Sequence, residues 1–446
     1  MKTSKFVPVN SKKKHWNAER LAKFLSKRLI GQKLAIDRIV TSFNLFLSPI
    51  KDPETPIFCG LLLGGTGSGK TLTAELLAEF FFNKKDRLTK ILGPEYAENH
   101  LISELTGSSH SYIGYDDPPV FSQNRINKPA IESRFEIAHR KNPRVRELSK
   151  DIHGIDRTLS SMSANDPNRK EMLYHRNQVF ASLNIQIENM FGNEPLYSVI
   201  LIDEIEKSSR ALWNILLEIS SKGTISIKGS RGVAGITSFR NSFVILTSNI
   251  ASDKFEKMAK GGSSRIGFST NETSDSANNE WHTALEELRK LLPPELINRL
   301  EDNTIVYHRL SSGQLNKVLD LELGEVSDLL WKSHGVAMTM TQAFRNFISE
   351  SIMRRQEYGG RQARKRVKKY VREIVAGPLA SGEILQGDII CLDVYKGQVV
   401  VMRDANRIVI PENILGGGNL GNESDLSSYQ PQPDDTDDVF EDDNDD

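Results

Sequence analysis

A glycine-rich segment of eight residues carries the strongest chemical signal in this chain. It reads Gly64-Gly65-Thr66-Gly67-Ser68-Gly69-Lys70-Thr71. An apolar run at 57–63 precedes it, and a helix-forming run at 72–82 follows it. Strand, G-x-x-x-x-G-K-[ST] and helix form the P-loop arrangement, in which backbone N–H groups and a helix N-terminus surround phosphates. We therefore predict that the segment binds a nucleoside triphosphate, with Lys70 on the outer phosphates and the Thr71 hydroxyl on Mg²⁺.

A second signal is a pair of carboxylates that follows an apolar run. Asp203 and Glu204 come directly after Val199-Ile200-Leu201-Ile202. Interior strands of a parallel sheet are apolar on both faces, and their carboxyl ends point into the ligand crevice. This pattern predicts a Walker B strand, with Asp203 on Mg²⁺ and Glu204 activating the attacking water. The alternative interpretation is a core strand that ends in two surface acids.

A third apolar run, at 243–248, ends in an amide side chain. Asn249 follows it and could form a hydrogen bond with the γ-phosphate or the attacking water. Taken alone this signal is weak, because Ser-Asn at a strand end is also typical of a turn.

The elements around these residues predict an α/β fold with a parallel sheet, followed by a smaller C-terminal α+β unit. We expect five segments: a basic N-terminal segment at 1–28, a nucleotide-binding domain at 29–303, a helical insertion within it at 118–195, a small domain at 304–405 and a disordered acidic tail at 406–446. The insertion is either a decoration packed on the main domain or a surface for substrates or adaptors. Its histidines lack the spacing of metal ligands, so no metal site is expected there.

Composition excludes some classes of protein. The chain has equal numbers of Lys/Arg and Asp/Glu, 58 of each, yet residues 431–446 hold nine acidic and no basic residues. The rest is therefore mildly basic, which is weak evidence for nucleic-acid binding. There are two cysteines, no apolar run long enough to cross a membrane and no signal-peptide pattern. These features favour a cytoplasmic protein with free thiols and no membrane contact.

In the order and the residues of its motifs, the chain resembles the Clp family of AAA+ ATPases, in its AAA-2 class, over roughly residues 28–117 and 196–400. The matching segments are Leu29-Ile30-Gly31-Gln32, the P-loop, Ser111-Tyr112-Ile113-Gly114-Tyr115, Ile202-Asp203-Glu204-Ile205-Glu206-Lys207, Leu246-Thr247-Ser248-Asn249, Pro294-Glu295-Leu296-Ile297-Asn298-Arg299-Leu300 and Tyr358-Gly359-Gly360-Arg361. The family commonly has a small residue such as glycine where Ser111 stands, and the insertion departs from its pattern.

The resemblance implies further roles in the nucleotide site. Ile30 and Gly31 would flank the adenine, and Asn249 would be the sensor 1 residue. Arg299 would be the arginine finger that reaches the ATP of a neighbouring subunit, and Arg361 would be the sensor 2 arginine. A guanidinium suits both roles, because charge accumulates on the transferred phosphoryl group. The alternatives are a surface arginine for Arg299 and one member of a basic cluster for Arg361.

The resemblance also implies two loops that contact proteins. Tyr112 and Ile113 would form a pore loop that grips polypeptide, because an aromatic beside an aliphatic residue binds a chain without reading its sequence. Ile266, Gly267 and Phe268 would form a loop tip that docks on a ClpP-type peptidase. An exposed turn and a local packing contact are the respective alternatives.

Together these expectations describe a single-ring ATPase, forming a hexamer, that uses ATP and Mg²⁺ to unfold protein substrates. It could feed a ClpP-like peptidase. The main alternative is an AAA+ nucleic-acid motor or loader that uses the basic insertion to bind phosphates. The Tyr-Ile-Gly loop argues against that alternative. A non-hydrolysing scaffold is a second alternative, and Glu204, Asn249 and Arg299 argue against it.

Overall fold

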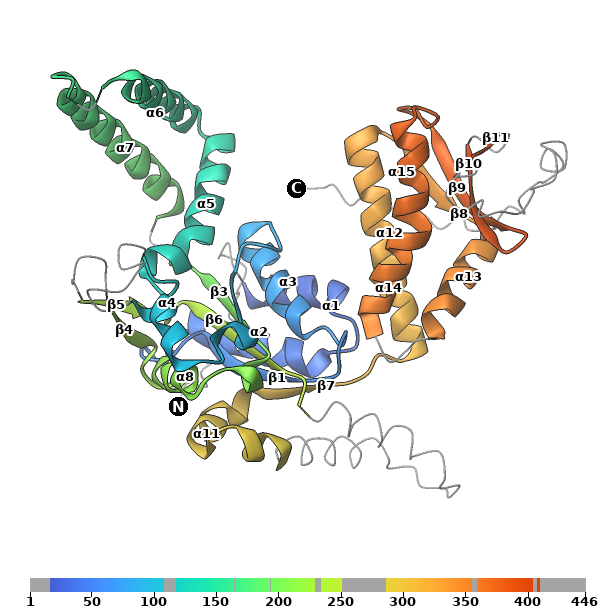
Figure 1. Ribbon diagram of the computed structural model, residues 1–446, viewed down its shortest axis with the longest axis horizontal. Coiled ribbons are helices and arrows are strands. Elements are labelled where there is room, and N and C mark those ends of the chain that lie inside the picture. Colours follow the sequence, from blue (N-terminus) through green and yellow to red (C-terminus); the bar gives the residue numbers. More distant parts are fainter. Residues whose placement is uncertain are drawn as a thin grey trace, which may run out of the picture. The chain divides into compact units, whose positions relative to one another are not determined.

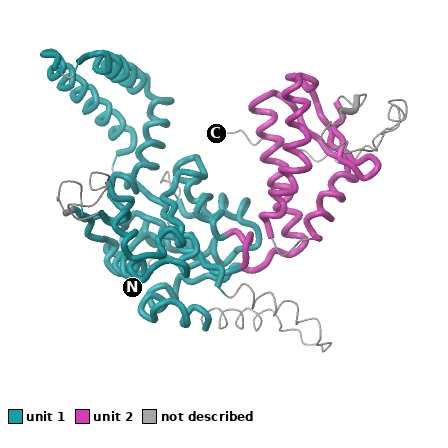
Figure 2. The backbone as a smooth tube through the Cα atoms, viewed as in Figure 1, with its two compact units in different colours: residues 1–64, 70–307 teal, residues 65–69, 308–446 magenta. Residues whose placement is uncertain are grey.

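The computed structural model describes residues 17–107, 118–163, 165–192, 194–228, 234–250, 286–354, 359–403 and 407–409. The chain forms two compact units (Figure 2). The first unit consists of residues 1–64 and 70–307, and the second of residues 65–69 and 308–446. The short P-loop segment therefore groups with the C-terminal unit, although the strand before it and the helix after it belong to the first.

The first unit is built around a five-stranded sheet in the order β2-β3-β6-β1-β7, and all its neighbouring strands run parallel (Figure 1). Its strands are β1 (Phe58–Gly64), β2 (Thr89–Leu92), β3 (Ser198–Asp203), β6 (Ser242–Ser248) and β7 (Thr304–Tyr307). Every residue of β1 and β6 is buried, as expected for central strands covered on both faces. The register places the carboxyl ends of β1, β3 and β6 at one edge of the sheet.

Side chains alternate between two cores, one on each face of the sheet. Phe58 and Leu62 of β1 belong to one core, whereas Leu61 and Leu63 belong to the other. The first core also takes buried residues of α1 (Ala18–Arg28), α2 (Lys33–Leu47) and α3 (Lys70–Phe82). The second takes buried residues of α8 (Arg210–Lys222) and α11 (Pro294–Leu300). Full burial of each leucine contributes about 1.5–3 kcal/mol, so both layers hold the strand ends in place.

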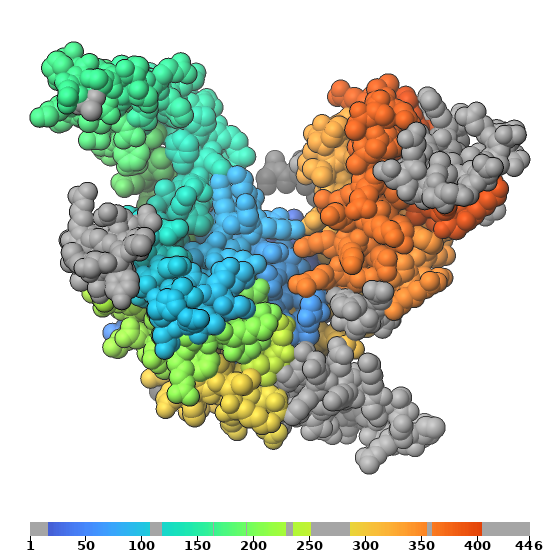
Figure 3. All heavy atoms as spheres, viewed as in Figure 1, coloured from blue at the N-terminus to red at the C-terminus, as the bar shows by residue number. Residues whose placement is uncertain are grey.

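The segment between β2 and β3 contains three long helices, namely α5 (Gln123–Lys141), α6 (Pro143–Ser161) and α7 (Arg169–Phe191). A small core of Ala138, Val145, Leu148 and Leu183 joins them. Asn142 ends α5 and caps α6, because its side-chain oxygen accepts from the Arg144 amide at 2.9 Å. Helices α6 and α7 lie side by side and project from the rest of their unit (Figures 1 and 3).

Short elements complete the first unit. They are the helical turns η1 (Gly93–Tyr96), η2 (Asn99–Ile102), α4 (Ser103–Thr106), η3 (Ile205–Lys207) and η6 (Glu301–Asn303), and the antiparallel pair β4 (Thr224–Lys228) and β5 (Ala234–Ser238).

The second unit packs helices against a four-stranded sheet in the order β11-β10-β9-β8. The strands are β8 (Ala337–Met340), β9 (Ile389–Tyr395), β10 (Gln398–Arg403) and β11 (Arg407–Val409). The helices are α12 (Ser312–His334), α13 (Gln342–Met353), α14 (Gly359–Val367), the π-helix η8 (Lys368–Arg372) and α15 (Glu373–Ala380). A parallel α/β sheet with a smaller C-terminal α+β unit confirms the predicted fold class.

Within the part of the chain that the structure describes, no helix combines the length and the apolar character needed to cross a membrane.

Candidate functional site

The P-loop follows β1 directly, and α3 begins at Lys70. Three of its glycines adopt positive φ angles, namely Gly64 (146°), Gly67 (79°) and Gly69 (108°). At Gly64 a side chain is also excluded by space, because a Cβ there would stand 2.5 Å from the Tyr307 carbonyl oxygen. Glycine is therefore required for the turn that a phosphate-binding loop must make.

Helix α3 is fixed at its start by a buried hydrogen bond. The hydroxyl groups of Thr73 on α3 and Tyr307 on β7 lie 2.7 Å apart. Burial raises the pKa of the Tyr307 hydroxyl above its ordinary value of 10.0, so this hydroxyl stays protonated. The bond ties the helix to the edge strand of the sheet, and so holds the residues at the helix N-terminus in place.

Lys70 lies at the carboxyl edge of the sheet and joins two strands there. Its side chain is buried, and its Nζ donates to the Gly64 carbonyl at 2.6 Å and to Asn249 Oδ1 at 3.0 Å. Asn249 directly follows β6, so the ammonium group links the ends of β1 and β6. The structure thus brings together the P-loop lysine and the strand-end amide that the sequence placed 179 residues apart.

Asn249 also contacts Glu204. Its Nδ2 donates to Glu204 Oε1 at 3.2 Å, while its Oδ1 accepts from Lys70. Only one orientation of the amide satisfies both bonds, because a lysine has no acceptor and a carboxylate has no donor. The backbone N–H of Asn249 donates to Glu206 Oε1 at 3.1 Å, so the backbone of this residue is held in place as well. Asn249 therefore holds the lysine and the candidate base at a set separation.

The other carboxylate oxygen of Glu204 is held by a residue that the sequence analysis did not assign. Lys207 Nζ donates to Glu204 Oε2 at 2.8 Å, and this hydrogen bond raises the pKa of Lys207. The Glu204 side chain remains 32% exposed, so water can reach the carboxylate. Lys207 lies three residues after Glu204 in the turn η3, and that spacing was the available signal.

Thr247 is a second residue whose role the sequence analysis missed. Its Oγ1 donates to Asp203 Oδ1 and accepts from the Glu204 backbone N–H at 3.2 Å. Thr247 is 1% exposed, so this hydroxyl is a buried link between β6 and the end of β3. The register pairs Ile202 with Leu246, which places Asp203 beside Thr247. The sequence alone does not reveal how β3 and β6 pair, and this register is needed to place Thr247 beside Asp203.

Glu204 adopts a left-handed backbone conformation, with φ 58° and ψ 53°. Non-glycine residues in this region cost of order 1–3 kcal/mol and concentrate at functional sites. Gly93 makes the conformation possible, because a Cβ on Gly93 would stand 2.2 Å from the Glu204 carbonyl oxygen. The turn aims the Glu204 side chain toward Asn249 and Lys207, whereas Asp203 stays at the strand end.

Two oxygen-bearing side chains at this edge are suited to Mg²⁺. Thr71 is half-buried in the first turn of α3, and Asp203 lies at the end of β3. Magnesium in phosphate sites is usually held by one or two protein oxygens together with phosphate oxygens and water. Among the residues that the structure describes, no group of three or more His, Cys, Asp or Glu could by itself hold a metal. A hydroxyl and a carboxylate fit an ion that arrives with the nucleotide.

The two predicted arginines belong to different units of the chain, Arg299 to the first and Arg361 to the second. Arg299 is near the end of α11, is exposed, and forms no hydrogen bond or ion pair with any described residue. Arg361 is exposed on α14 of the second unit. Just before it, the Gly360 N–H donates to the Gly67 carbonyl at 2.9 Å, and Gly359 has a φ of 53°. The start of α14 therefore contacts the P-loop segment within the second unit.

The remaining predicted residues are placed as follows. Ile30 and Gly31 form the turn between α1 and α2, where Gly31 has a φ of 79°. Tyr112 and Ile113 lie outside the described residues, as does the Ile266–Gly267–Phe268 tripeptide.

Two family models match the chain. A model of the AAA domain (Cdc48 subfamily) matches residues 55–129 and 176–303, and a model of the C-terminal, D2-small domain of ClpB protein matches residues 310–392. The first match is interrupted at 130–175, within the helical insertion.

Several characterised proteins are similar to the chain. The ClpC/MecB negative regulator of genetic competence from Bacillus subtilis is 26% identical over 85% of this chain and 37% of its own length. The chaperone protein ClpB of Oceanobacillus iheyensis is 25% identical over 86% of this chain and 38% of its own. The chloroplastic ClpA homologue of Brassica napus, an ATP-binding subunit of an ATP-dependent Clp protease, is 26% identical over 85% and 35%. The chain thus spans little more than a third of each relative.

Proposed function

Because this chain belongs to the Clp family of AAA+ ATPases, we propose that it hydrolyses ATP and uses the energy to thread polypeptide through a ring. The observation that carries the proposal is the group of hydrogen bonds joining Lys70, Asn249 and Glu204 at the carboxyl edge of the sheet. A parallel sheet of this kind binds ligands at that edge.

Hydrolysis assigns a separate task to each of these residues. Lys70 binds the β- and γ-phosphates, and the Gly64–Gly69 backbone surrounds them. Glu204 accepts the proton of the attacking water, and Lys207 and Asn249 orient its carboxylate for that step. Thr71 and Asp203 would hold Mg²⁺, which supplies neutralising charge to the phosphate oxygens when it is bound.

The site needs one more cation, which we assign to a neighbouring subunit. Arg299 is exposed and has no partner among the described residues, so it is available to an ATP bound elsewhere. Ile30 and Gly31 contact the adenine, and Arg361 contacts the γ-phosphate. A guanidinium supplied in trans couples hydrolysis to assembly, which supports a homo-oligomeric ring, in this proposal a hexamer.

The proposed substrate is an unfolded segment of protein, gripped by Tyr112 and Ile113 in the axial pore. Two relatives support a protein substrate, since one is a chaperone and the other is an ATP-binding subunit of a Clp protease. The second relative also supports a peptidase partner, and we assign its docking to Ile266, Gly267 and Phe268. Two free thiols, Cys59 and Cys391, suit a reducing compartment such as the cytoplasm.

Glu204→Gln tests the hydrolysis. The amide cannot accept the proton, so phosphate release should fall at least ~100-fold while ATP binding persists. Glu218→Gln is the matched control, because Glu218 is an exposed carboxylate on α8. Phosphate release and fluorescent-nucleotide binding are the measurements. Unchanged phosphate release from Glu204→Gln would contradict the role of Glu204.

Tyr112→Ala tests the threading separately. The variant should retain ATP hydrolysis but lose the unfolding of a tagged fluorescent protein, because the aromatic grip is gone. Tyr174→Ala is the control, since Tyr174 is an exposed tyrosine on α7. Full unfolding by Tyr112→Ala would reject the pore-loop assignment while leaving the ATPase assignment intact.

Phe268→Ala tests peptidase docking. The wild-type protein should co-purify with a ClpP-type peptidase, and the variant should not, because the resemblance assigns the Phe268 side chain to a pocket of the partner. Absence of any such complex with the wild-type protein would rule out docking.

A further inference from the structure

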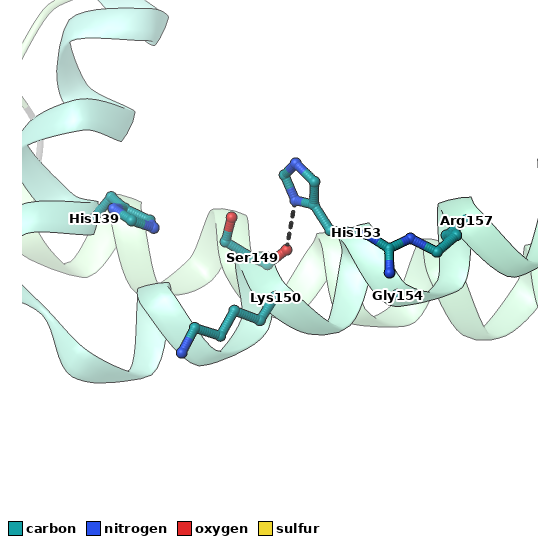
Figure 4. Close-up of a pocket in the computed structure, with 6 residues that line it drawn as sticks. All are labelled: His139, Ser149, Lys150, His153, Gly154 and Arg157. Atoms are coloured by element: carbon teal, nitrogen blue, oxygen red, sulfur yellow. Dashed lines mark hydrogen bonds between the residues drawn. The ribbon is translucent and has the colours of Figure 1, made fainter.

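A cationic pocket lies on the helical insertion, away from the nucleotide-site residues (Figure 4). Its volume is about 350 Å³, and its lining is formed by His139 of α5 and by Ser149, Lys150, His153, Gly154 and Arg157 of α6. No carboxylate lines it. A Cβ on Gly154 would meet no atom within 4 Å, so the missing side chain leaves this part of the pocket open.

Two lining side chains of this pocket, Lys150 and Arg157, are cationic. Lys150 and Arg157 are exposed, and in the described ranges neither forms a hydrogen bond or an ion pair. Of the nearby carboxylates, Glu147 pairs with Arg144 at 2.6 Å, whereas Asp156 pairs with Arg176 at 2.5 Å and also interacts electrostatically with His153. Asp151, the remaining acid of α6, is not part of the lining.

Two histidines place imidazole rings beside these cations. His153 Nδ1 lies 2.9 Å from the Ser149 carbonyl oxygen, which fixes the ring beside the opening. The His139 ring lies 5.7 Å from the ring of Phe135, measured between centroids, on the last turns of α5. Two imidazoles, one ammonium and one guanidinium therefore line the pocket from two helices that are joined by a short turn at Asn142.

We propose that this pocket binds the chain's own acidic segment, residues 434–446. That segment carries nine Asp/Glu and no Lys/Arg, with carboxylates in adjacent pairs such as Asp434 and Asp435. Residues 410–433 connect it to β11, and an extended chain of that length spans up to ~80 Å. Since Lys150 and Arg157 are exposed, we expect salt to weaken the contact.

Photo-cross-linking in the full chain tests the proposal. A benzophenone amino acid at Phe440 should cross-link to residues between His139 and Arg157, as mapped by mass spectrometry. The double reversal Lys150→Glu/Arg157→Glu should lower the yield about tenfold, the equivalent of 1.4 kcal/mol. Lys170→Glu, which reverses an exposed cation of α7 outside the pocket, should leave it nearly unchanged.

A second experiment exchanges the charges of the tail and the pocket. Replacing Asp434, Asp435, Asp437 and Asp438 by lysine should abolish the cross-link in the wild-type background and restore it in the double-reversal background. Circular dichroism checks that each variant is folded. Cross-links that map elsewhere, equal losses with Lys170→Glu, or no restoration would overturn the proposal. So would single-stranded DNA binding that requires Lys150 and Arg157 and is unchanged by the tail substitutions, because the pocket would then serve phosphates.

Discussion

At the scale of single residues, Thr247 shows how one hydroxyl can hold two candidate catalytic residues. It donates to the Asp203 carboxylate and accepts from the Glu204 backbone N–H. Thr247→Val keeps the branched shape but leaves that buried N–H unpaired, at a cost of about 1–3 kcal/mol in stability. We expect ATP hydrolysis to fall sharply as well, while Thr247→Ser retains both. Urea unfolding and phosphate release are the measurements, and wild-type turnover by Thr247→Val would contradict the positioning role.

Gly93 offers a test of the strained turn at Glu204. Gly93→Ala places a Cβ 2.2 Å from the Glu204 carbonyl oxygen, so the turn must shift. We expect a loss of about 1–3 kcal/mol in stability and slower hydrolysis, because Glu204 moves away from Asn249. Gly324→Ala is the matched control, since a Cβ there meets nothing within 4 Å. In the middle of α12 it should add about 0.5–1 kcal/mol. Equal hydrolysis rates in the two variants would contradict the prediction.

The residue scale also shows which parts of the site the sequence could predict. The P-loop, Asp203, Glu204 and Asn249 are predictable because each stands at the end of an apolar strand, where local pattern is sufficient. Thr247 and Lys207 were not assigned. The role of Thr247 depends on the register between β3 and β6, which are separated by an entire helix and a hairpin. The left-handed backbone conformation of Glu204 could not be predicted from the sequence either, since it depends on the close approach of Gly93.

At the scale of elements, β1 carries the buried thiol of Cys59, and the ionisation of this thiol makes the unfolding free energy of the protein depend on pH. Burial raises the pKa of Cys59 from 9.0 to about 12. Below pH 9 the thiol is protonated in both states, so its contribution is intact. Between pH 9 and about 12 the unfolded chain loses this proton and the native protein keeps it, so stability falls by up to ~1.4 kcal/mol per pH unit.

Cys59→Ala should therefore flatten the fall in unfolding free energy above pH 9, as measured by urea unfolding at a series of pH values. A thiol reagent at pH 8 should leave Cys59 unmodified in the native protein and modify it after unfolding, because the thiol is buried and protonated. Rapid modification of native Cys59 would contradict its burial, and an unchanged slope in Cys59→Ala would contradict the pKa shift.

Element prediction succeeded where continuous apolar runs marked buried strands, as in β1, β3 and β6. It was less informative in the insertion, where helical periodicity indicated helices but not how they pack. The turn at Asn142 and Pro143 separates α5 from α6, and Asn142 caps the second helix. The pocket beside that turn depends on the angle between the two helices, which no local pattern encodes. Periodicity predicts an element, whereas tertiary packing decides which of its faces meet.

At the scale of the whole molecule, the order of the motifs along the chain predicted the family, although no single motif would have been sufficient. The grouping of residues 65–69 with the C-terminal unit was not predictable, because it arises from contacts such as that between Gly67 and Gly360. The proposed assembly is a further level, at which a residue such as Arg299 would acquire its partner from another subunit. Arg299 is the residue that tests this level most directly.

Two inactive variants should restore activity to each other if Arg299 acts in trans. Arg299→Ala keeps an intact P-loop but lacks the finger, whereas Lys70→Ala keeps the finger but has a defective phosphate site. In mixed rings, a Lys70→Ala subunit can supply Arg299 to the ATP of an Arg299→Ala neighbour. Phosphate release should therefore rise on mixing and peak at intermediate ratios. Arg289→Ala, at an exposed arginine that precedes α11, should be active alone. If mixtures stay as inactive as either variant, Arg299 does not act across subunits, and the assembly has no part in completing the site.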